Sequence, residues 1–327
     1  MAALSTMKAW TCRRYGGPDA LALENVPAPR LGPHDVLIRV RATTVSSADS
    51  RIRALRLPPG FGSLGRLFLG FKGPRRSILG TEVSGTVASV GERVSAFKAG
   101  DPVTAFLDTK MGGHAEYAAI KETGLIAAKP KNLSFEAAAS MCFGGMTARD
   151  YIRKCRLKSG ETLLIIGASG TVGSAFVQLA KQMGVLVTAG TSSGNVGQVR
   201  DLGADEVIDY TKEAYTDPGK SWDVIADTIA ASDFQSCLPI LKEGGRYLSL
   251  AGGLGDMLAR ARGSKRSISG PAQSRREDLL ELCLLAEHGA YTPVIDSVFA
   301  FENMREAHRR TDSGRKRGSV VVRVTDD

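Results

Sequence analysis

Several features are missing from this 327-residue sequence, and each absence excludes a class of protein. No apolar run approaches the ~20 residues that a membrane-spanning helix needs, so we expect no membrane span. The opening residues, MAALSTMKAW, contain no apolar signal core, so we expect no export signal. The five cysteines are scattered, odd in number and without a CxxC pair, which predicts reduced thiols and a cytoplasmic protein.

The sequence is basic, with a formal net charge of +9, but it lacks the pattern of a nucleic-acid platform. Two stretches, 51–76 and 260–276, carry much of the excess charge, and neither is interleaved with aromatic residues. We therefore expect no nucleic-acid partner. A phosphate-rich cofactor or simple solubility explains the charge instead.

The pattern of short segments predicts an α/β protein with two domains. Residues 1–126 consist of short strands bounded by turn residues, which predicts a mostly β domain that residues 297–327 complete. In residues 127–296 strands alternate with helices, which predicts a doubly wound parallel sheet. Within this part we expect single helices over 134–155 and 234–244.

A glycine-rich turn gives the sharpest functional signal. The segment LLIIGASGTVGSAFVQLAKQ predicts a buried strand, a turn and a helix, and its turn matches the dinucleotide fingerprint with Ala in the first position. A helix that begins at such a turn directs its N–H groups at phosphates. The predicted pyrophosphate-binding residues are Gly167, Ala168, Ser169, Gly170, Thr171, Val172 and Gly173.

The end of the next strand indicates which dinucleotide binds. NAD-binding sites usually place an acid there, ~20 residues after the fingerprint, for the ribose hydroxyls. This chain has Thr191, Ser192 and Ser193 instead, and hydroxyl groups accept a 2′-phosphate that a carboxylate would repel. The sequence therefore predicts NADPH as the cofactor. Arg200 in the following helix either helps to bind that phosphate or is an ordinary solvated charge.

Several motifs together resemble the medium-chain dehydrogenase/reductases, most closely the quinone oxidoreductase branch and its bacterial relatives labelled NAD(P)-dependent alcohol dehydrogenases. They are MKAWTCRRYGGPDALALENVPAP, LGTEVSGTVASVGERVSAFKAGDPV, GGHAEYAA, GASGTVG and LGADEVIDY, and the resemblance covers nearly the whole chain. It implies a GroES-like catalytic domain, a Rossmann domain and an active site in the cleft between them. It also implies a homodimer formed through the Rossmann sheet, whose exposed edge strands need covering.

The zinc sites of the alcohol dehydrogenases in this family have no counterpart here. Where those enzymes carry Cys-His and Gly-His-Glu, this chain has Ser46-Ser47 and Gly80-Thr81-Glu82, and hydroxyl groups are poor zinc ligands. The four-cysteine structural lobe is also missing. We expect no bound metal, and we interpret the four histidines, which are far apart, as surface or structural residues: His34, His114, His288 and His308.

Without zinc, the family chemistry implied is hydride transfer from NADPH to a small, hydrophobic, electrophilic C=C or quinone acceptor. Ser46 is the first candidate for the proton donor and Ser47 the second; Asp49 would hold the loop, and Arg53 would steady the loop or the substrate. A water or the cofactor ribose is an equal alternative. Quinone oxidoreductases often have Asn in place of Ser46 and Tyr in place of Arg51, so this chain departs from their pattern.

The resemblance also implies further cofactor contacts: Thr147 near the cofactor, Tyr210 beside the 2′-phosphoribose, and the backbone of Ala251 and Gly252 along the nicotinamide. The apolar stretch 55–71 is interpreted either as a lip over the substrate or as a self-packed loop, and the arginines around it could meet an acidic group. Two other functions remain open. One is a zinc-free carbonyl reductase or alcohol dehydrogenase, and the other is a non-catalytic NADPH-binding or RNA-binding protein.

Overall fold

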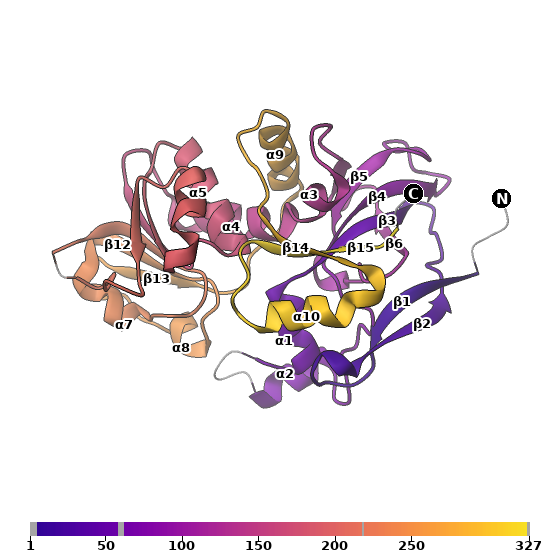
Figure 1. Cartoon of the computed structure of the whole chain (residues 1–327), viewed down its shortest axis with the longest axis horizontal. Coiled ribbons are helices and arrows are strands. Elements are labelled where there is room, and N and C mark those ends of the chain that lie inside the picture. Colours follow the sequence, from indigo (N-terminus) through magenta and orange to yellow (C-terminus); the bar gives the residue numbers. More distant parts are fainter. Residues whose placement is uncertain (1–4, 58–61, 218, 326–327) are drawn as a thin grey trace. The chain divides into compact units, whose positions relative to one another are not determined.

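The computed structural model describes residues 5–57, 62–217 and 219–325, and the chain folds into two compact units (Figure 1). Of the described residues, the β unit comprises 5–57, 63–143 and 274–325, and the α/β unit comprises Gly62, 144–217 and 219–273. The boundaries thus fall at 143/144 and 273/274, whereas the sequence predicts them at 126/127 and 296/297. Two packing contacts account for the difference: α3 (Phe135–Ala139) packs on strands of the β unit, and α9 (Arg276–Glu287) packs on one of its edge strands.

A seven-stranded sheet forms the centre of the β unit, with strand order β14-β15-β3-β4-β5-β7 and with β6 paired to β3. Alternate residues of β3, including Val36, Ile38 and Val40, are fully buried in its main apolar cluster. A separate hairpin is formed by β1 (Thr6–Cys12) and β2 (Leu21–Pro27). The sheet strands are β3 (Asp35–Val45), β4 (Glu82–Val90), β5 (Pro102–Phe106), β6 (Tyr117–Lys121), β7 (Ile126–Ala128), β14 (Ile295–Ala300) and β15 (Ser319–Arg323).

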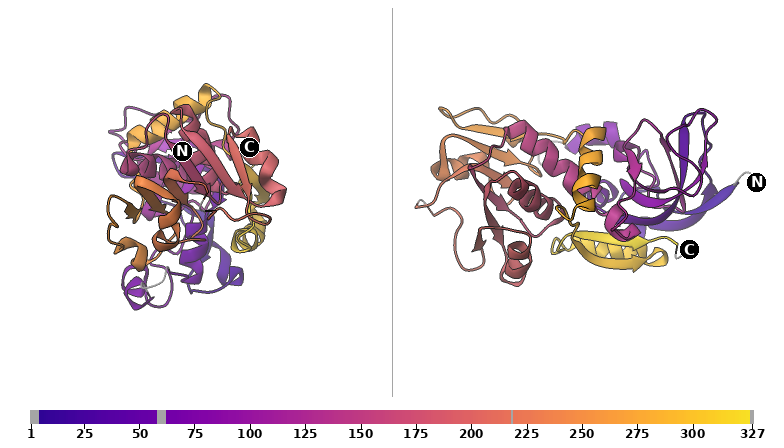
Figure 2. Two further views of the ribbon diagram at one scale, coloured as in Figure 1. Left: turned by 90° about the vertical axis from the view of Figure 1, so that its left-hand side faces the viewer. Right: turned by 90° about the horizontal axis from the view of Figure 1, so that it is seen from above.

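Besides α3 and α9, the described part of the β unit contains further helices. They are α1 (Ser47–Ala54), α2 (Gly62–Leu69) and α10 (Met304–Asp312). Figure 2 shows the C-terminal segment, in yellow, as one block in which α10 lies against β14 and β15. Because β15 also pairs with β3, the end of the chain completes this sheet.

The α/β unit contains a six-stranded parallel sheet with strand order β10-β9-β8-β11-β12-β13. The order reverses between β8 and β11, which is where dinucleotides bind in doubly wound sheets. Its strands are β8 (Thr162–Ile166), β9 (Leu186–Thr191), β10 (Glu206–Asp209), β11 (Trp222–Asp227), β12 (Leu241–Ser249) and β13 (Arg266–Ser269). Its helices are α4 (Cys142–Cys155), which begins in the β unit, α5 (Thr171–Gln182), α6 (Val196–Asp201), α7 (Phe234–Cys237) and α8 (Leu254–Met257). The predicted fold class is confirmed.

Two predicted helices are wrong in their extent. The segment 134–155 is broken near Ser140, where α3 ends, and the chain starts a second helix at Cys142. The Glu82 carboxylate accepts a hydrogen bond from the backbone N–H of Phe143 at 2.6 Å and so caps this new start. The segment 234–244 is α-helical only to Cys237; Leu238–Ile240 form a single 3-10 turn that contains Pro239, and Leu241 already belongs to β12.

Across the described residues, every helix is too short or too polar to cross a lipid bilayer.

Candidate functional site

The turn between β8 and α5 has the geometry of a phosphate cradle. Gly167 follows the last residue of β8 with φ +83°, and Gly170 sits in extended conformation as the N-cap residue of α5. A Cβ placed on Gly173 would lie 2.2 Å from the carbonyl oxygen of Gly167, so only glycine lets the first turn of α5 lie this close to the strand. The N-cap residue Gly170 has no side chain that could cap α5, and the start of a helix is a place where backbone N–H groups bind phosphates.

The loop after β11 supports this turn, and no sequence motif indicates this support. Thr228 donates hydrogen bonds from Oγ1 to the carbonyl oxygens of Ile166 (2.9 Å) and Gly167 (3.2 Å). Asp227, which is buried, accepts hydrogen bonds from the backbone N–H groups of Ile229 and Ser232, and it thereby fixes the loop. The two strands at the reversal point thus shape the cradle together.

Helix α4 also contacts the cradle. A Cβ on Gly144 would lie 2.4 Å from the carbonyl oxygen of Thr171, so α4 crosses the start of α5 at close range. Thr147, one turn further along α4, is half-buried on the same side of that helix. This position is compatible with the cofactor contact that the family resemblance implies for Thr147.

The end of β9 gathers the predicted 2′-phosphate residues with one residue that sequence reasoning missed. Thr191 is buried, Ser192 is half-buried and Ser193 is exposed. Ser193 donates a hydrogen bond from Oγ to Asp209 Oδ2 at 2.5 Å, because Asp209 ends the neighbouring strand β10. Hydrogen bonds from Ser193 and Thr211 lower the pKa of Asp209 to about 2, so its carboxylate is ionised. The strand pairing could have revealed this acid, since Asp209 is level with Thr191.

The remaining predicted cofactor residues lie at the corresponding ends of other strands. Tyr210 follows β10 and its side chain is 45% exposed, so its ring is available to a ligand. Ala251 and Gly252 follow β12 and are half-buried. A Cβ on Gly252 would lie 2.0 Å from a carboxylate oxygen of Asp256 and from Ser249 Oγ, so the backbone there is tightly enclosed.

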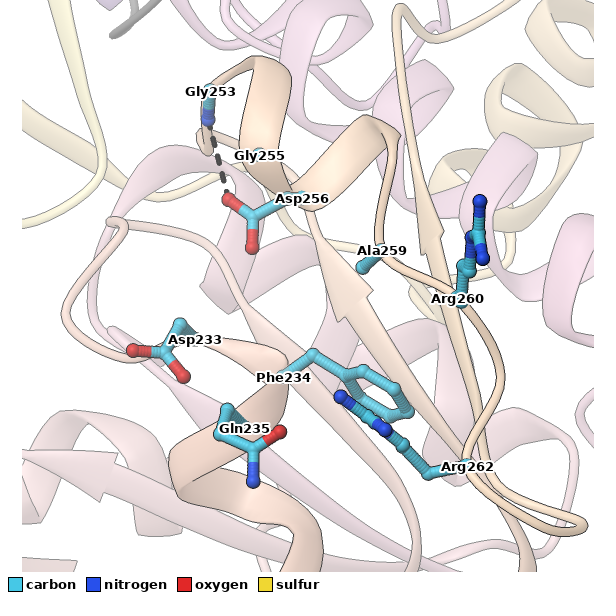
Figure 3. Close-up of a pocket in the computed structure, with 9 residues that line it drawn as sticks. All are labelled: Asp233, Phe234, Gln235, Gly253, Gly255, Asp256, Ala259, Arg260 and Arg262. Carbon is cyan, nitrogen blue, oxygen red and sulfur yellow. Dashed lines mark hydrogen bonds between the residues drawn. The ribbon is translucent and has the colours of Figure 1, made fainter.

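A pocket of about 420 Å³ lies next to this last segment, between the starts of α7 and α8 (Figure 3). The N–H of Gly253 donates to Asp256 Oδ2 at 3.2 Å, and Figure 3 shows Asp233 and Gln235 on the opposite wall with Arg262 beside the ring of Phe234. Since Asp233 and Gly253 each follow a parallel strand, the pocket opens at the carboxyl-end edge of the sheet, where such folds bind ligands.

In the β unit the predicted catalytic residues form the start of α1. Ser46 is the N-cap residue: its Oγ accepts a hydrogen bond from the backbone N–H of Asp49 at 3.2 Å and donates one to Asp49 Oδ2 at 2.6 Å. Asp49 is fully buried and also accepts hydrogen bonds from the backbone N–H groups of Ser46 and Gly80. Ser46 and Asp49 thus tie α1 to the loop before β4. Ser47 is exposed at the first position of the helix.

Arg53 lies at the centre of a buried polar network rather than at an open surface. Its side chain is 0% exposed, and its guanidinium donates to the carbonyl oxygen of Gly16 (2.5 Å), to Asp312 Oδ2 (2.5 Å) and to His308 Nδ1 (3.2 Å). His308 lies edge-on to His114, with the ring centroids 5.5 Å apart. Burial lowers the pKa of both histidines, so both are neutral. His114 and His308 are therefore buried, whereas His34 and His288 are exposed.

Glu82, at the place where the zinc enzymes have the glutamate of Gly-His-Glu, is buried in this chain. Thr44 donates a hydrogen bond from Oγ1 to Glu82 Oε1 at 2.5 Å. Burial raises the pKa of Glu82 to about 7, against the opposing effect of these hydrogen bonds. In the described part of the chain no group of three or more His, Cys, Asp or Glu side chains is positioned to hold a metal ion.

Two family models match this chain, and the second extends across parts of both units. Residues 32–131 match the alcohol dehydrogenase GroES-like domain, and residues 202–322 match the family described as zinc-binding dehydrogenase. Among curated relatives, 2-methylene-furan-3-one reductase of Solanum lycopersicum is 34% identical over 97% of this chain and 79% of its own length. Quinone oxidoreductase of Mus musculus is 32% identical over 97% of both chains. The solved quinone oxidoreductase of Coxiella burnetii is 27% identical, covers 98% of this chain and 100% of its own, and has a TM-score of 0.86.

The two matched domains and the cradle at Gly167–Gly173 define an NAD(P)H-dependent oxidoreductase. The full-length relatives then identify the chain more closely: it belongs to the medium-chain dehydrogenase/reductase family, in its quinone oxidoreductase-like branch. The cradle fits the pyrophosphate of a nicotinamide dinucleotide, because its glycines leave room for the phosphates at the start of α5.

Proposed function

We propose that this enzyme reduces an activated C=C bond or a quinone with hydride from NADPH and uses no zinc. The main support for this proposal is the N-cap of α1, which Ser46 and Asp49 form. Ser46 and Asp49 hydrogen-bond to each other at a place where the zinc enzymes of the family carry a ligand. Without a Lewis acid at that place, the acceptor must bring its own activation, as enones and quinones do. One relative of Arabidopsis thaliana, 32% identical over 97% of this chain, carries the name NADPH-dependent alkenal/one oxidoreductase.

The residues of this chain would position the reactants and supply the proton. When bound, the cofactor supplies the hydride, and the N–H groups at the start of α5 hold its pyrophosphate. Negative charge that develops on the acceptor oxygen needs a hydrogen-bond donor. Ser47 suits that role better than Ser46, because Ser47 is exposed whereas the hydroxyl of Ser46 already donates to Asp49. A water or a ribose hydroxyl is the competing donor.

We also propose NADPH rather than NADH as the preferred cofactor. Ser192 offers a hydroxyl group at the end of β9, whereas the hydroxyl of Ser193 already donates to Asp209. Lys212 lies nearby, with its Nζ 3.4 Å from Asp209 Oδ2. The carboxylate of Asp209 is the one feature that opposes this preference, and two hydroxyl groups already occupy it. A solved structure 27% identical to this chain bears the name NAD-dependent alcohol dehydrogenase, so the choice needs measurement.

The test is a screen of NADPH oxidation over an enone, a quinone and an aldehyde, with product analysis and metal analysis of the same preparation. The proposal predicts a saturated ketone or a hydroquinone, and well under one zinc per chain. An allylic alcohol as product, or a stoichiometric metal whose removal abolishes activity, would refute it.

Two serine variants separate the donor from the cap. Ser47→Ala should lower kcat while leaving the Kd for NADPH unchanged. Ser46→Ala should mainly cost stability, about 1 kcal/mol for the lost N-cap. Full activity in Ser47→Ala would assign the proton to water or to the ribose.

A further inference from the structure

A second, smaller pocket lies in the β unit beside the candidate donor Ser47. Its volume is about 230 Å³, which suits a small polar group more than a whole substrate. It is formed by α1, the segment just after α1 and the end of α10. The lining residues are Ser47, Ser50, Arg51, Arg56, Thr311 and Asp312.

The acidic residue of this pocket is already neutralised. Asp312 accepts hydrogen bonds from Arg53 and Arg56 at 2.5 and 2.6 Å, and Ser50 also donates to it. Two of these partners, Ser50 and Arg53, are buried, so the carboxylate is held in place within the wall. An incoming anion would therefore not meet an uncompensated negative charge from Asp312.

Arg51 lines the same pocket but takes no part in the ion pairs that Arg53 and Arg56 form with Asp312. Throughout the described ranges 5–57, 62–217 and 219–325, no hydrogen bond or ion pair to the Arg51 side chain is seen. Arg51 is exposed as a residue, but desolvation of its guanidinium by neighbouring atoms and then the nearby charge of Arg56 lower its pKa. A bound anion would offset both effects, because it favours the charged form of the guanidinium.

Other arginines of the basic stretch 51–76 have structural partners of their own. Arg53 donates three hydrogen bonds within the buried network, as described above. Arg66 donates to the carbonyl oxygen of Phe71, and Arg75 donates to that of Leu67. These hydrogen bonds give Arg53, Arg66 and Arg75 structural roles, which distinguishes them from Arg51.

We propose that this pocket binds a carboxylate group of the acceptor, an inference that rests on the proposed reductase function. Ser47 and Arg51 are one helical turn apart on the same side of α1, with their Cα atoms roughly 6 Å apart along the helix axis, and both line the pocket. The cofactor phosphates already have the cradle at α5 and the hydroxyl groups at the end of β9. The guanidinium of Arg51 is thus left for an acidic acceptor, which it would bind through charge-assisted hydrogen bonds.

The first experiment compares two acceptors that differ only in charge: an enone that ends in a carboxylate on a short saturated chain, and the methyl ester of the same compound. Wild-type enzyme should favour the acid in kcat/KM by about 10- to 100-fold, the ratio expected for a charge-assisted contact. Arg51→Gln should abolish this preference by raising the KM for the acid and should leave the ester unchanged. Arg93→Gln, an exposed arginine of the same unit, is the matched control for net charge and should behave as wild type.

The second experiment measures binding without turnover. The saturated analogue of the acid should bind wild type and Arg93→Gln in calorimetry, and it should bind Arg51→Gln at least about 10-fold more weakly. Equal kcat/KM for acid and ester in wild type, with equal binding to all three proteins, would overturn the pocket assignment while leaving the reductase function intact. A weakened Kd for NADPH in Arg51→Gln, with no effect on the acid, would assign the pocket to the cofactor and also overturn the proposal. Failure to reduce either acceptor would refute the reductase function instead, and calorimetry would still decide the pocket.

Discussion

Replacing Gly173 with alanine should abolish tight cofactor binding while leaving the protein folded. A Cβ at this position would lie 2.2 Å from the carbonyl oxygen of Gly167 and 2.7 Å from Cα of Ala168. Ordinary contact begins near 3.4 Å, so the start of α5 would have to retreat from the backbone of the turn by about 1.2 Å. Overpacking of this kind costs about 1–3 kcal/mol.

The effect on binding follows from the N–H groups that move with the helix. A charge-assisted hydrogen bond contributes about 1.5–3 kcal/mol, so losing good geometry for even one of them raises Kd about 10- to 150-fold. The assay is calorimetric titration of NADPH, with thermal unfolding of the same samples to show that the variant is folded.

Gly197→Ala is the matched control. Gly197 lies in α6 of the same unit and its added Cβ would meet no atom within 4 Å. Alanine there should stabilise the helix by about 0.5–1 kcal/mol and leave the Kd for NADPH unchanged. If Gly173→Ala binds NADPH as tightly as Gly197→Ala does, the close approach of α5 to the strand is not what forms the phosphate site.

Three further predictions follow from other parts of the molecule. Ser192→Asp should weaken NADPH binding at least about 10-fold through repulsion of the 2′-phosphate while sparing NADH; equal loss for both cofactors would contradict the assignment. Burial raises the pKa of Glu82 to about 7, well above its unfolded value, so the folded state binds the proton more tightly than the unfolded state does. The free energy of unfolding should therefore fall by about 3 kcal/mol as pH rises from about 4.5 through 7. Denaturant unfolding should show this fall in wild type and not in Glu82→Gln, and the same pH dependence in both proteins would disprove the prediction. The parallel sheet should also form a homodimer through its edge strand β13, and a concentration-independent monomer in analytical ultracentrifugation would exclude that.

The sequence was sufficient for the fold class and for the strand, turn and helix over 162–182, because both depend on local patterns. Buried strands alternate with amphipathic helices, and glycine is required where Gly173 meets the strand. The helix errors have an equally local origin. At 134–155 the continuous helical pattern hid the break near Ser140, since the cap of the second helix comes from Glu82, which is 61 residues away from Phe143 in the chain.

Tertiary contacts explain what the sequence did not reveal about the candidate site. The role of Asp209 depends on the pairing of β10 with β9, which places its carboxylate against Ser193. The burial of Arg53 depends on His308 and Asp312, which are more than 250 residues further along the chain. Comparison with the family motifs identifies Ser46 and Arg53 as candidate site residues. The structure is needed to show that the polar groups of both side chains already have hydrogen-bond partners.

The central claim is that hydride passes from NADPH to the carbon–carbon double bond of an activated acceptor. The most direct measurement uses NADPH deuterated at the transferable position, an enone and mass spectrometry of the product. The product should be a saturated ketone with one deuterium on the carbon β to the carbonyl, made by enzyme that contains no stoichiometric zinc. An allylic alcohol with deuterium on the carbinol carbon would contradict it.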